Sequence, residues 1–269
     1  MNILKLLETF SDDKLVNSVG SRRETFGQFG QIGKNVALAS VPFGLAALTS
    51  SKAFASDISP TPSTPIGALQ LALTLEYLED EFYQTALDTT GLIPTGGRDE
   101  KVFMQISQHE ASHVAYLIQG LGGTGSANFV AKPTFDFTAG GAFADVFSNY
   151  QTFLAVAQAF EDTGVRAYKG QAANLISEKD LLQAALQIHS VEARHASEVR
   201  RLRGQKGWIT GNVAPAAAAQ LSYNGEENTM QASFNTAGTG LFGVDAGTES
   251  FDEPLTTAQT VTIANLFIV

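Results

Sequence analysis

One eight-residue pattern occurs twice in this chain and restricts the fold more than any other feature. Residues 106–113 read Ile-Ser-Gln-His-Glu-Ala-Ser-His, and residues 188–195 read Ile-His-Ser-Val-Glu-Ala-Arg-His. Both copies place a Glu three residues before a His, namely Glu110 before His113 and Glu192 before His195. Residues three apart lie on one face of an α-helix. Each copy can therefore direct a carboxylate and an imidazole at the same point.

A second pair of segments repeats in the same order. Glu76 is followed after seven residues by Tyr83, and Glu161 is followed after seven residues by Tyr168. These two Glu are 85 residues apart, and the two Glu of the first pattern are 82 apart. Such similar offsets indicate that two helix pairs follow one another in tandem.

Apolar periodicity and helix-end signals predict four long helices. Thr64 and Pro65 suit the N-cap and first residue of the first helix, and Ser177 with Asp180 has the spacing of a capping box before the fourth. Gly-rich stretches separate the helices. We expect the helices over residues 65–87, 99–121 and 145–168, and from the Ser177 cap to residue 203.

The predicted fold class is all-α, a four-helix bundle with one long crossover. The crossover covers residues 124–141, and we expect Phe135, Phe137 and Phe143 to pack over an end of the bundle. Residues 56–64 are predicted to be a linker and residues 65–205 the bundle. Residues 206–269 are predicted to be a C-terminal extension of irregular structure with a short final helix, over residues 255–267.

Residues 1–55 have the parts of an export signal. Arg22 and Arg23 precede an apolar stretch over residues 36–48, and Ala53-Phe54-Ala55 forms a small-x-small cleavage site. The segment resembles a twin-arginine signal, except that Thr25 stands where such signals usually carry Phe. We expect export to the periplasm with cleavage after Ala55; the alternative is an N-terminal extension that stays attached. The apolar stretch is shorter than the ~20 residues of a membrane-spanning helix.

Composition restricts the chemistry further. The chain has no cysteine, which excludes disulfides, zinc ribbons, iron–sulfur sites on thiolates and thiol catalysis. Its net charge of −10 argues against a surface for nucleic acid or for anionic membranes. Any metal must therefore be held by carboxylates and by some of the four His.

The buried carboxylates predict the number of metal ions. Four Glu that face a bundle core without partners would each cost several kcal/mol. Two divalent cations supply four positive charges and balance the four carboxylates. Mixed carboxylate and imidazole ligands suit iron or manganese, so we expect two Fe or Mn ions.

These residues resemble the di-metal carboxylate site of ferritin-like proteins. Residues 75–83 read Leu-Glu-Tyr-Leu-Glu-Asp-Glu-Phe-Tyr, and residues 160–168 read Phe-Glu-Asp-Thr-Gly-Val-Arg-Ala-Tyr. Both phrases are similar to a narrower branch, the ferritin-like domains of exported bacterial proteins and of desiccation-related proteins in plants. The resemblance covers residues 65–203, and the segment from Phe251 to Leu255 also looks like that branch.

The resemblance implies a role for each residue. Glu110 and Glu192 would bridge the two metal ions. Glu76 and His113 would complete the ligands of one metal ion. Glu161 and His195 would complete the ligands of the other. Tyr83 and Tyr168 would lie near the site as hydrogen-bond partners or as phenols that quench radicals.

Several other residues compete for these roles. Glu79 is an alternative to Glu76, but only Glu76 has the Tyr partner that Glu161 has. His109 and His189 have no counterpart in the repeat, so we expect them at the surface or beside a ligand. The remaining charged groups are expected in solvent or around the site, with arginines favouring the C-terminal dipole of the fourth helix: Asp80, Glu81, Asp162, Arg194, Arg200, Arg201 and Arg203. Gly164 suits close helix packing or a bulge near the site.

The favoured function is that of an exported di-iron or di-manganese protein that oxidises Fe(II) or consumes peroxide or O₂ in stress protection. Peroxide dismutation of the manganese-catalase type, a non-catalytic structural role in stress, and iron storage are the alternatives. The expected partners are metal ions with O₂ or peroxide, and the sequence leaves open whether the chain forms a homo-oligomer.

Overall fold

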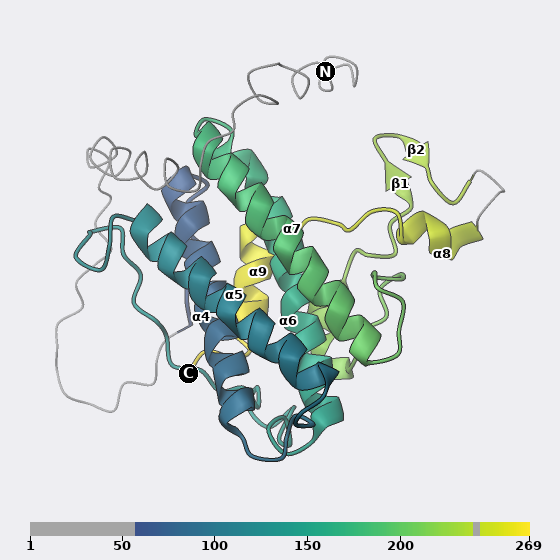
Figure 1. Ribbon diagram of the computed structural model, residues 1–269. Coiled ribbons are helices and arrows are strands. Elements are labelled where there is room, and N and C mark those ends of the chain that lie inside the picture. Colours follow the sequence, from purple (N-terminus) through teal and green to yellow (C-terminus); the bar gives the residue numbers. More distant parts are fainter. Residues whose placement is uncertain (1–56, 239–242) are drawn as a thin grey trace. The chain divides into compact units, whose positions relative to one another are not determined.

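The computed structural model describes residues 57–238 and 243–269, and within them the predicted four-helix bundle is confirmed. The predicted export signal lies outside the described residues. Four long helices dominate Figure 1: α4 Pro65–Asp88, α5 Arg98–Gly120, α6 Tyr150–Gln171 and α7 Lys179–Leu202. Among the described residues, no helix combines the length and apolarity needed to cross a membrane.

Local chemistry explains where the helices begin. The predicted cap of α4 is confirmed, because the Thr64 hydroxyl accepts a hydrogen bond from the Gly67 amide at 3.1 Å. The predicted start of the third helix at residue 145 is wrong. Asp145 instead belongs to a turn that ends at Asn149, whose side chain accepts from the Gln151 amide and caps α6.

The predicted cap of the fourth helix is also wrong. Glu178 is the N-cap of α7 and makes no capping bond through its side chain. A short 3₁₀ helix, η1 Ala172–Leu175, continues from α6. The Glu178 amide donates to the Leu175 carbonyl at 2.9 Å, so Ser177 belongs to the turn between η1 and α7.

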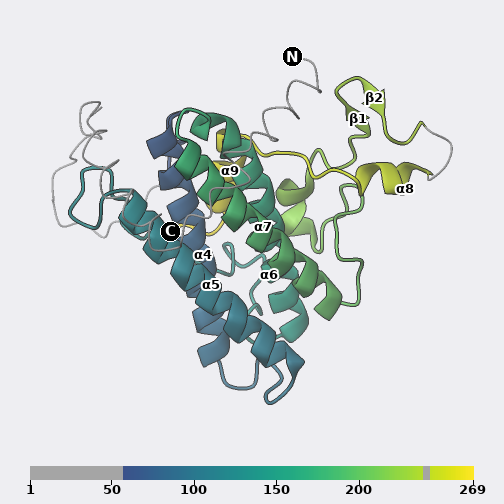
Figure 2. The ribbon, with the colours of Figure 1, turned by 45° about the horizontal axis from the view of Figure 1, so that its top comes forward.

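The helices pack as two pairs, α4 with α5 and α6 with α7 (Figure 2). The pairs meet where α4 contacts α6 and α5 contacts α7. The segment over residues 121–149 is the long crossover between the pairs. Its Phe137 and Phe143 are buried and belong to the main hydrophobic core, where Phe143 stacks on Phe267 with ring centroids 6.2 Å apart.

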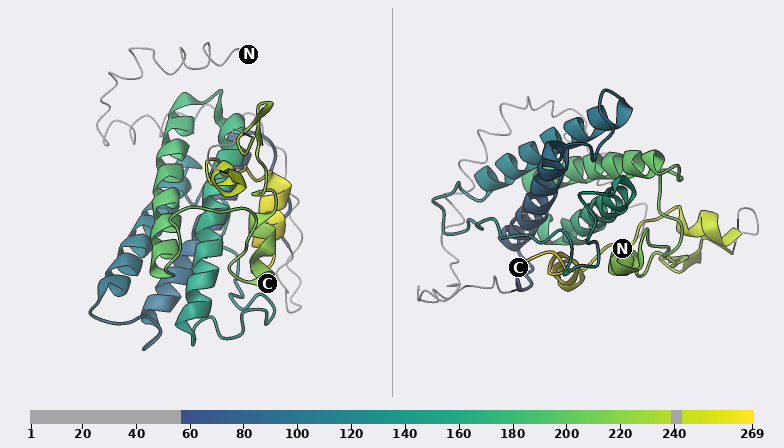
Figure 3. Two further views of the ribbon diagram at one scale, coloured as in Figure 1. Left: turned by 90° about the vertical axis from the view of Figure 1, so that its right-hand side faces the viewer. Right: turned by 90° about the horizontal axis from the view of Figure 1, so that it is seen from below.

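The C-terminal extension contains several short elements. They are η2 Ala217–Tyr223, the antiparallel strands β1 Met230–Gln231 and β2 Phe234–Asn235, α8 Gly243–Thr248 and α9 Thr257–Ala264. The predicted short final helix is α9, which a Thr256–Gln259 capping box begins. Helix α9 lies along α6 and α4 (Figure 3). Beyond its end, the ring of Phe267 packs edge-on against that of Phe160, with ring centroids 4.7 Å apart.

Arg166 of α6 connects the bundle to this extension. Its side chain is 1% exposed, and its nitrogens donate to the carbonyls of Glu253, Ser222 and Asn224 at 2.8, 2.5 and 2.9 Å. Glu226 Oε1 lies 2.7 Å from Arg166 Nε and supplies the balancing charge. Buried charges are tolerated when they are paired and hydrogen-bonded in this way.

A second buried ion pair excludes one of the two expectations for Asp162 and gives Arg200 a contact in addition to its place in the last turn of α7. Asp162 is not solvated and Arg200 does not act only on the helix dipole, because the two form a buried ion pair between α6 and α7. The Tyr223 hydroxyl of η2 donates to Asp162 Oδ2 at 2.5 Å. The extension therefore completes a polar network that begins within the bundle.

Candidate metal centre

The six residues proposed from the repeats converge inside the bundle, one or two from each long helix. They form two groups of ligand atoms, and within each group all the atoms lie within 4.8 Å of one another. The first group is Glu76, Glu110, His113 and Glu192, and the second is Glu110, Glu161, Glu192 and His195. Glu110 and Glu192 belong to both groups.

The helical spacing produces this convergence directly. On α5 and on α7, the Glu and the His of each repeat lie on the buried face, one turn apart. All four Glu are fully buried, and His195 is 4% exposed. The His113 side chain is 12% exposed, so it lies at the margin of the same interior.

Each imidazole faces several carboxylates through a single nitrogen. His113 Nδ1 lies 3.1 Å from Glu76 Oε2, 3.1 Å from Glu110 Oε2 and 3.2 Å from Glu192 Oε1. His195 Nδ1 lies 2.8 Å from Glu110 Oε1 and 3.3 Å from Glu161 Oε2. Glu110 thus directs one oxygen towards each His.

Several of these atoms have no hydrogen-bond partner. They are Glu110 Oε1, Glu161 Oε2, both carboxylate oxygens of Glu192, and His195 Nδ1. His195 Nδ1 and Glu110 Oε1 lie 2.8 Å apart, so each is the nearest group of opposite charge to the other when the imidazole is protonated. Buried polar atoms in proteins are nearly always paired, so a cluster of unpaired acceptors and one imidazole nitrogen fits bound cations.

The pKa values of these buried carboxylates and imidazoles also fit a site for bound cations. Burial, followed by the charges of Glu110 and Glu76, raises the pKa of Glu192 well above its usual value. Burial also raises the pKa of Glu110, to about 7. Burial lowers the pKa of His195, but Glu161 and Glu110 outweigh it and raise the value to about 11. Protons thus compensate the excess negative charge when no cation does.

Two tyrosines hold the outer carboxylates across the repeat. The Tyr83 hydroxyl of α4 donates to Glu161 Oε1 of α6, and the Tyr168 hydroxyl of α6 donates to Glu76 Oε1 of α4, both at 2.5 Å. Such bonds orient a carboxylate and leave its other oxygen directed at the centre. Both tyrosines are buried.

Glu79 is buried beside the centre but belongs to neither group of ligand atoms. The 85-residue offset that relates Glu76 to Glu161 also relates Glu79 to Gly164. A Cβ at Gly164 would lie 3.1 Å from Glu192 Oε2 and 3.4 Å from Glu79 Oε1. The missing side chain of α6 therefore makes room for two carboxylates. Burial and then the charges of Glu192 and Glu161 raise the pKa of Glu79 well above its usual value.

His109 lies beside a proposed ligand, as one of the two expectations for it stated. Its Nδ1 is 2.9 Å from His195 Nε2, and its Nε2 is 2.8 Å from the amide of Gln105. His189 belongs to neither group and is half-buried elsewhere on α7. Of the other acidic candidates, Glu81 is paired with Lys132 at the surface.

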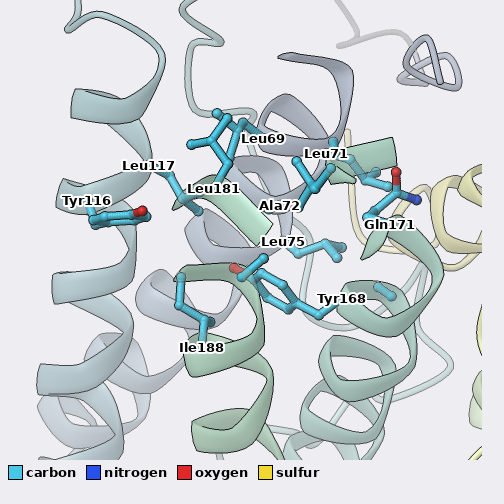
Figure 4. A pocket seen from close by; sticks show the side chains of 14 residues that line it. Leu69, Leu71, Ala72, Leu75, Tyr116, Leu117, Tyr168, Gln171, Leu181 and Ile188 are labelled. Atoms are coloured by element: carbon cyan, nitrogen blue, oxygen red, sulfur yellow. The ribbon is translucent and has the colours of Figure 1, made fainter. Parts of the chain in front are cut away.

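A groove and an interior cavity lie near the centre, at different levels of α5 and α7. A groove of about 820 Å³ is lined by His109, His195 and the cations Arg98, Lys101 and Arg194. An apolar cavity of about 20 Å³ lies at the other level, bordered by Tyr168 (Figure 4). No pattern in the sequence indicated the groove or the cavity, because each combines residues from more than one helix.

Comparison with known proteins agrees with this architecture. The family model for the ferritin-like domain matches residues 64–205, more than half of the chain. The chain therefore belongs to the ferritin-like domain family. Searches of curated proteins and of solved structures gave no match.

Proposed function

We propose that this protein binds two iron or manganese ions in the bundle core and oxidises Fe(II) or consumes peroxide or O₂ in stress protection. The observation that carries the proposal is that Glu110 and Glu192 belong to both groups of ligand atoms. These two residues are the bridging ligands in this proposal. Glu76 with His113 completes one metal site, and Glu161 with His195 completes the other.

Charge balance supports two divalent ions. The four Glu supply four negative charges, and the two His are neutral when they bind metal. When bound, two such ions would supply the two electrons that, together with two protons from solvent, reduce O₂ to hydrogen peroxide or hydrogen peroxide to two water molecules.

The chain's own residues hold the site in position. Tyr83 and Tyr168 orient the outer carboxylates and stand where a phenol can quench a stray radical. His109 fixes the ring of His195, because a nitrogen that binds metal leaves the other nitrogen to make a hydrogen bond. Water-soluble reactants and protons reach His195 through the groove lined by His109.

Export to the periplasm is part of the proposal. It depends on Arg22, Arg23 and the cleavage motif that ends at Ala55. The N-terminal sequence of protein isolated from the periplasm tests it, and we expect this sequence to begin at Ser56. An intact N-terminus on cytoplasmic protein would contradict it.

Metal analysis of protein from its native compartment tests the central claim. We expect about two Fe or Mn ions per chain, and Fe(II) oxidation or peroxide consumption by the loaded protein. Oxygen release from hydrogen peroxide with manganese, and none with iron, would instead favour the manganese-catalase alternative. A protein with only trace metal that Glu110→Ala does not change would refute metal binding.

A further inference from the structure

The apolar cavity beside Tyr168 lies inside the bundle. Side chains of all four long helices line it, and all except the half-buried Tyr116 are buried. Figure 4 shows Leu75, Ile188 and Tyr168 facing it from three helices. Along α7 the cavity is bordered by residues 181–188, whereas the groove reaches residues 194–198. The centre lies between these levels.

The wall has three polar side chains, Tyr116, Tyr168 and Gln171, and the last two are hydrogen-bonded to residues outside the cavity. The Tyr168 hydroxyl donates to Glu76, the Gln171 amide nitrogen donates to Thr257 Oγ1 at 3.0 Å, and the Gln171 oxygen accepts from Asn174 at 2.8 Å. A buried water needs two to four polar partners, and apolar cavities stay dry and take up apolar molecules such as xenon. The cavity therefore favours an apolar occupant over water.

The volume restricts the occupant. A cavity of about 150 Å³ holds benzene, and about 10–15 Å³ is the minimum for one water molecule. The present cavity, at about 20 Å³, suits a molecule of two or three atoms. Its wall includes Leu75, which precedes Glu76, and Tyr168, which is bonded to Glu76. An occupant would therefore lie next to the Glu76–His113 half of the centre.

We propose that this cavity is a binding site for dioxygen, which reaches the centre from the Tyr168 side while polar reactants use the groove. The inference rests on the proposed function, because it names dioxygen as a substrate. Dioxygen is small and apolar and partitions into such cavities. Hydrogen peroxide is polar and is better solvated in the groove.

Xenon is the probe for the cavity itself. We expect crystals of the full chain under xenon pressure to show xenon between Tyr168 and Ala185. Ala185→Leu fills this space, because Ala185 lines the cavity. Ala184→Leu adds the same volume to α7 at a buried residue that does not line the cavity, so it is the matched control. Ala185→Val adds less volume and replaces Ala185→Leu if that variant does not fold.

The kinetic test separates the two oxidants. Ala185→Leu should raise the KM for dioxygen in Fe(II) oxidation several-fold, with metal content and the KM for hydrogen peroxide unchanged. Ala184→Leu should change neither KM. Absence of xenon from the wild-type cavity, or an unchanged KM for dioxygen in a variant that excludes xenon, would overturn the inference. A wild-type protein that binds no metal, or that neither oxidises Fe(II) nor consumes peroxide, would instead refute the proposed function. A metal-loaded protein that consumes peroxide but not dioxygen would overturn the inference alone.

Discussion

The two halves of the centre present equivalent ligand atoms but differ in what lies behind them. Tyr83 and Tyr168 make identical bonds, each 2.5 Å long, to the Glu of the other half. Behind Tyr83 the core is filled by Phe82, Phe103 and Phe153, with ring centroids 5.4, 5.8 and 6.4 Å away. Behind Tyr168 lies the cavity. The repeat thus determines the inner atoms of the site, while access to it depends on residues that the repeat does not share.

The same contrast holds at the level of charge. Glu79 on α4 has Gly164 as its counterpart on α6, so the centre contains a fifth buried carboxyl on one side only. His109 likewise contacts His195, and the residue 82 positions further on is Val191. The repeated residues supply ligands, and the unrepeated ones adjust how the two halves are reached and oriented.

The largest effect on metal content is expected at the carboxylates that both halves of the centre share. Glu192→Ala removes a carboxylate common to both groups of ligand atoms, so metal content should fall from about two ions per chain to near zero. Elemental analysis of purified protein measures this. Glu81→Ala, at the surface of α4, is the control and should retain both ions. Retention of one ion in Glu192→Ala would contradict a bridging role.

Replacing one imidazole should separate the halves. His113→Ala and His195→Ala each remove a ligand from one group only, so each variant should retain about one ion per chain. Metal titration monitored by calorimetry gives the number of ions. Equal loss of both ions in either variant would show that the halves bind metal only together.

Metal affinity should rise with pH at both halves. The carboxylates raise the pKa of His195 to about 11 and raise that of His113 above its usual value, so both rings hold protons at neutral pH when metal is absent. Metal displaces these protons, and higher pH therefore favours the bound state, by roughly tenfold per pH unit for each proton released. Calorimetry in two buffers of different ionisation enthalpy counts the protons. No proton release at pH 7 would contradict this prediction.

Replacing either tyrosine should weaken metal binding by a similar and smaller amount. The two replacements should differ in their effect on the KM for dioxygen. Tyr83→Phe and Tyr168→Phe each remove one bond to an outer carboxylate, which should weaken metal binding about tenfold. Only Tyr168→Phe changes a group that borders the cavity, so only this variant should alter the KM for dioxygen. The same change in the KM for dioxygen in both variants would remove the distinction drawn between the halves.

The smallest effect is expected at Glu79. Its raised pKa favours the neutral carboxyl, which Gln resembles, so Glu79→Gln should change metal affinity less than twofold. Glu76→Gln is the matched variant on the same helix and should lose the ion of its half-site. If Glu79→Gln loses that ion and Glu76→Gln retains it, Glu79 and not Glu76 is the ligand from α4.

The parts of the molecule that the sequence predicted depend on periodicity. The spacing of Glu110 to His113 and of Glu192 to His195 indicates one helix face whatever surrounds it, and the offsets to Glu76 and Glu161 identify the other two helices. These six residues do converge. The all-α bundle and the Thr64 cap follow from equally local rules and are confirmed.

The features that were missed depend on contacts between distant segments. Ser177 is a residue type that often caps a helix. Because η1 continues from α6, Ser177 instead lies in the turn before α7. The ion pair of Asp162 with Arg200 has no spacing signal, because its partners are 38 residues apart on different helices. The cavity is an absence of side chains, and no residue type marks it.

The contacts of Arg166 and Phe267 affect the order in which the molecule can fold during translation. The carbonyls that satisfy Arg166 lie at residues 222, 224 and 253, and Phe267 packs on Phe160. When the ribosome has completed α7, the Arg166 guanidinium still lacks the carbonyls and the carboxylate that it contacts in the full chain, and Phe160 lacks its contact with Phe267. Residues 64–205, which match the family, therefore reach the packing seen here only after the extension has been synthesised.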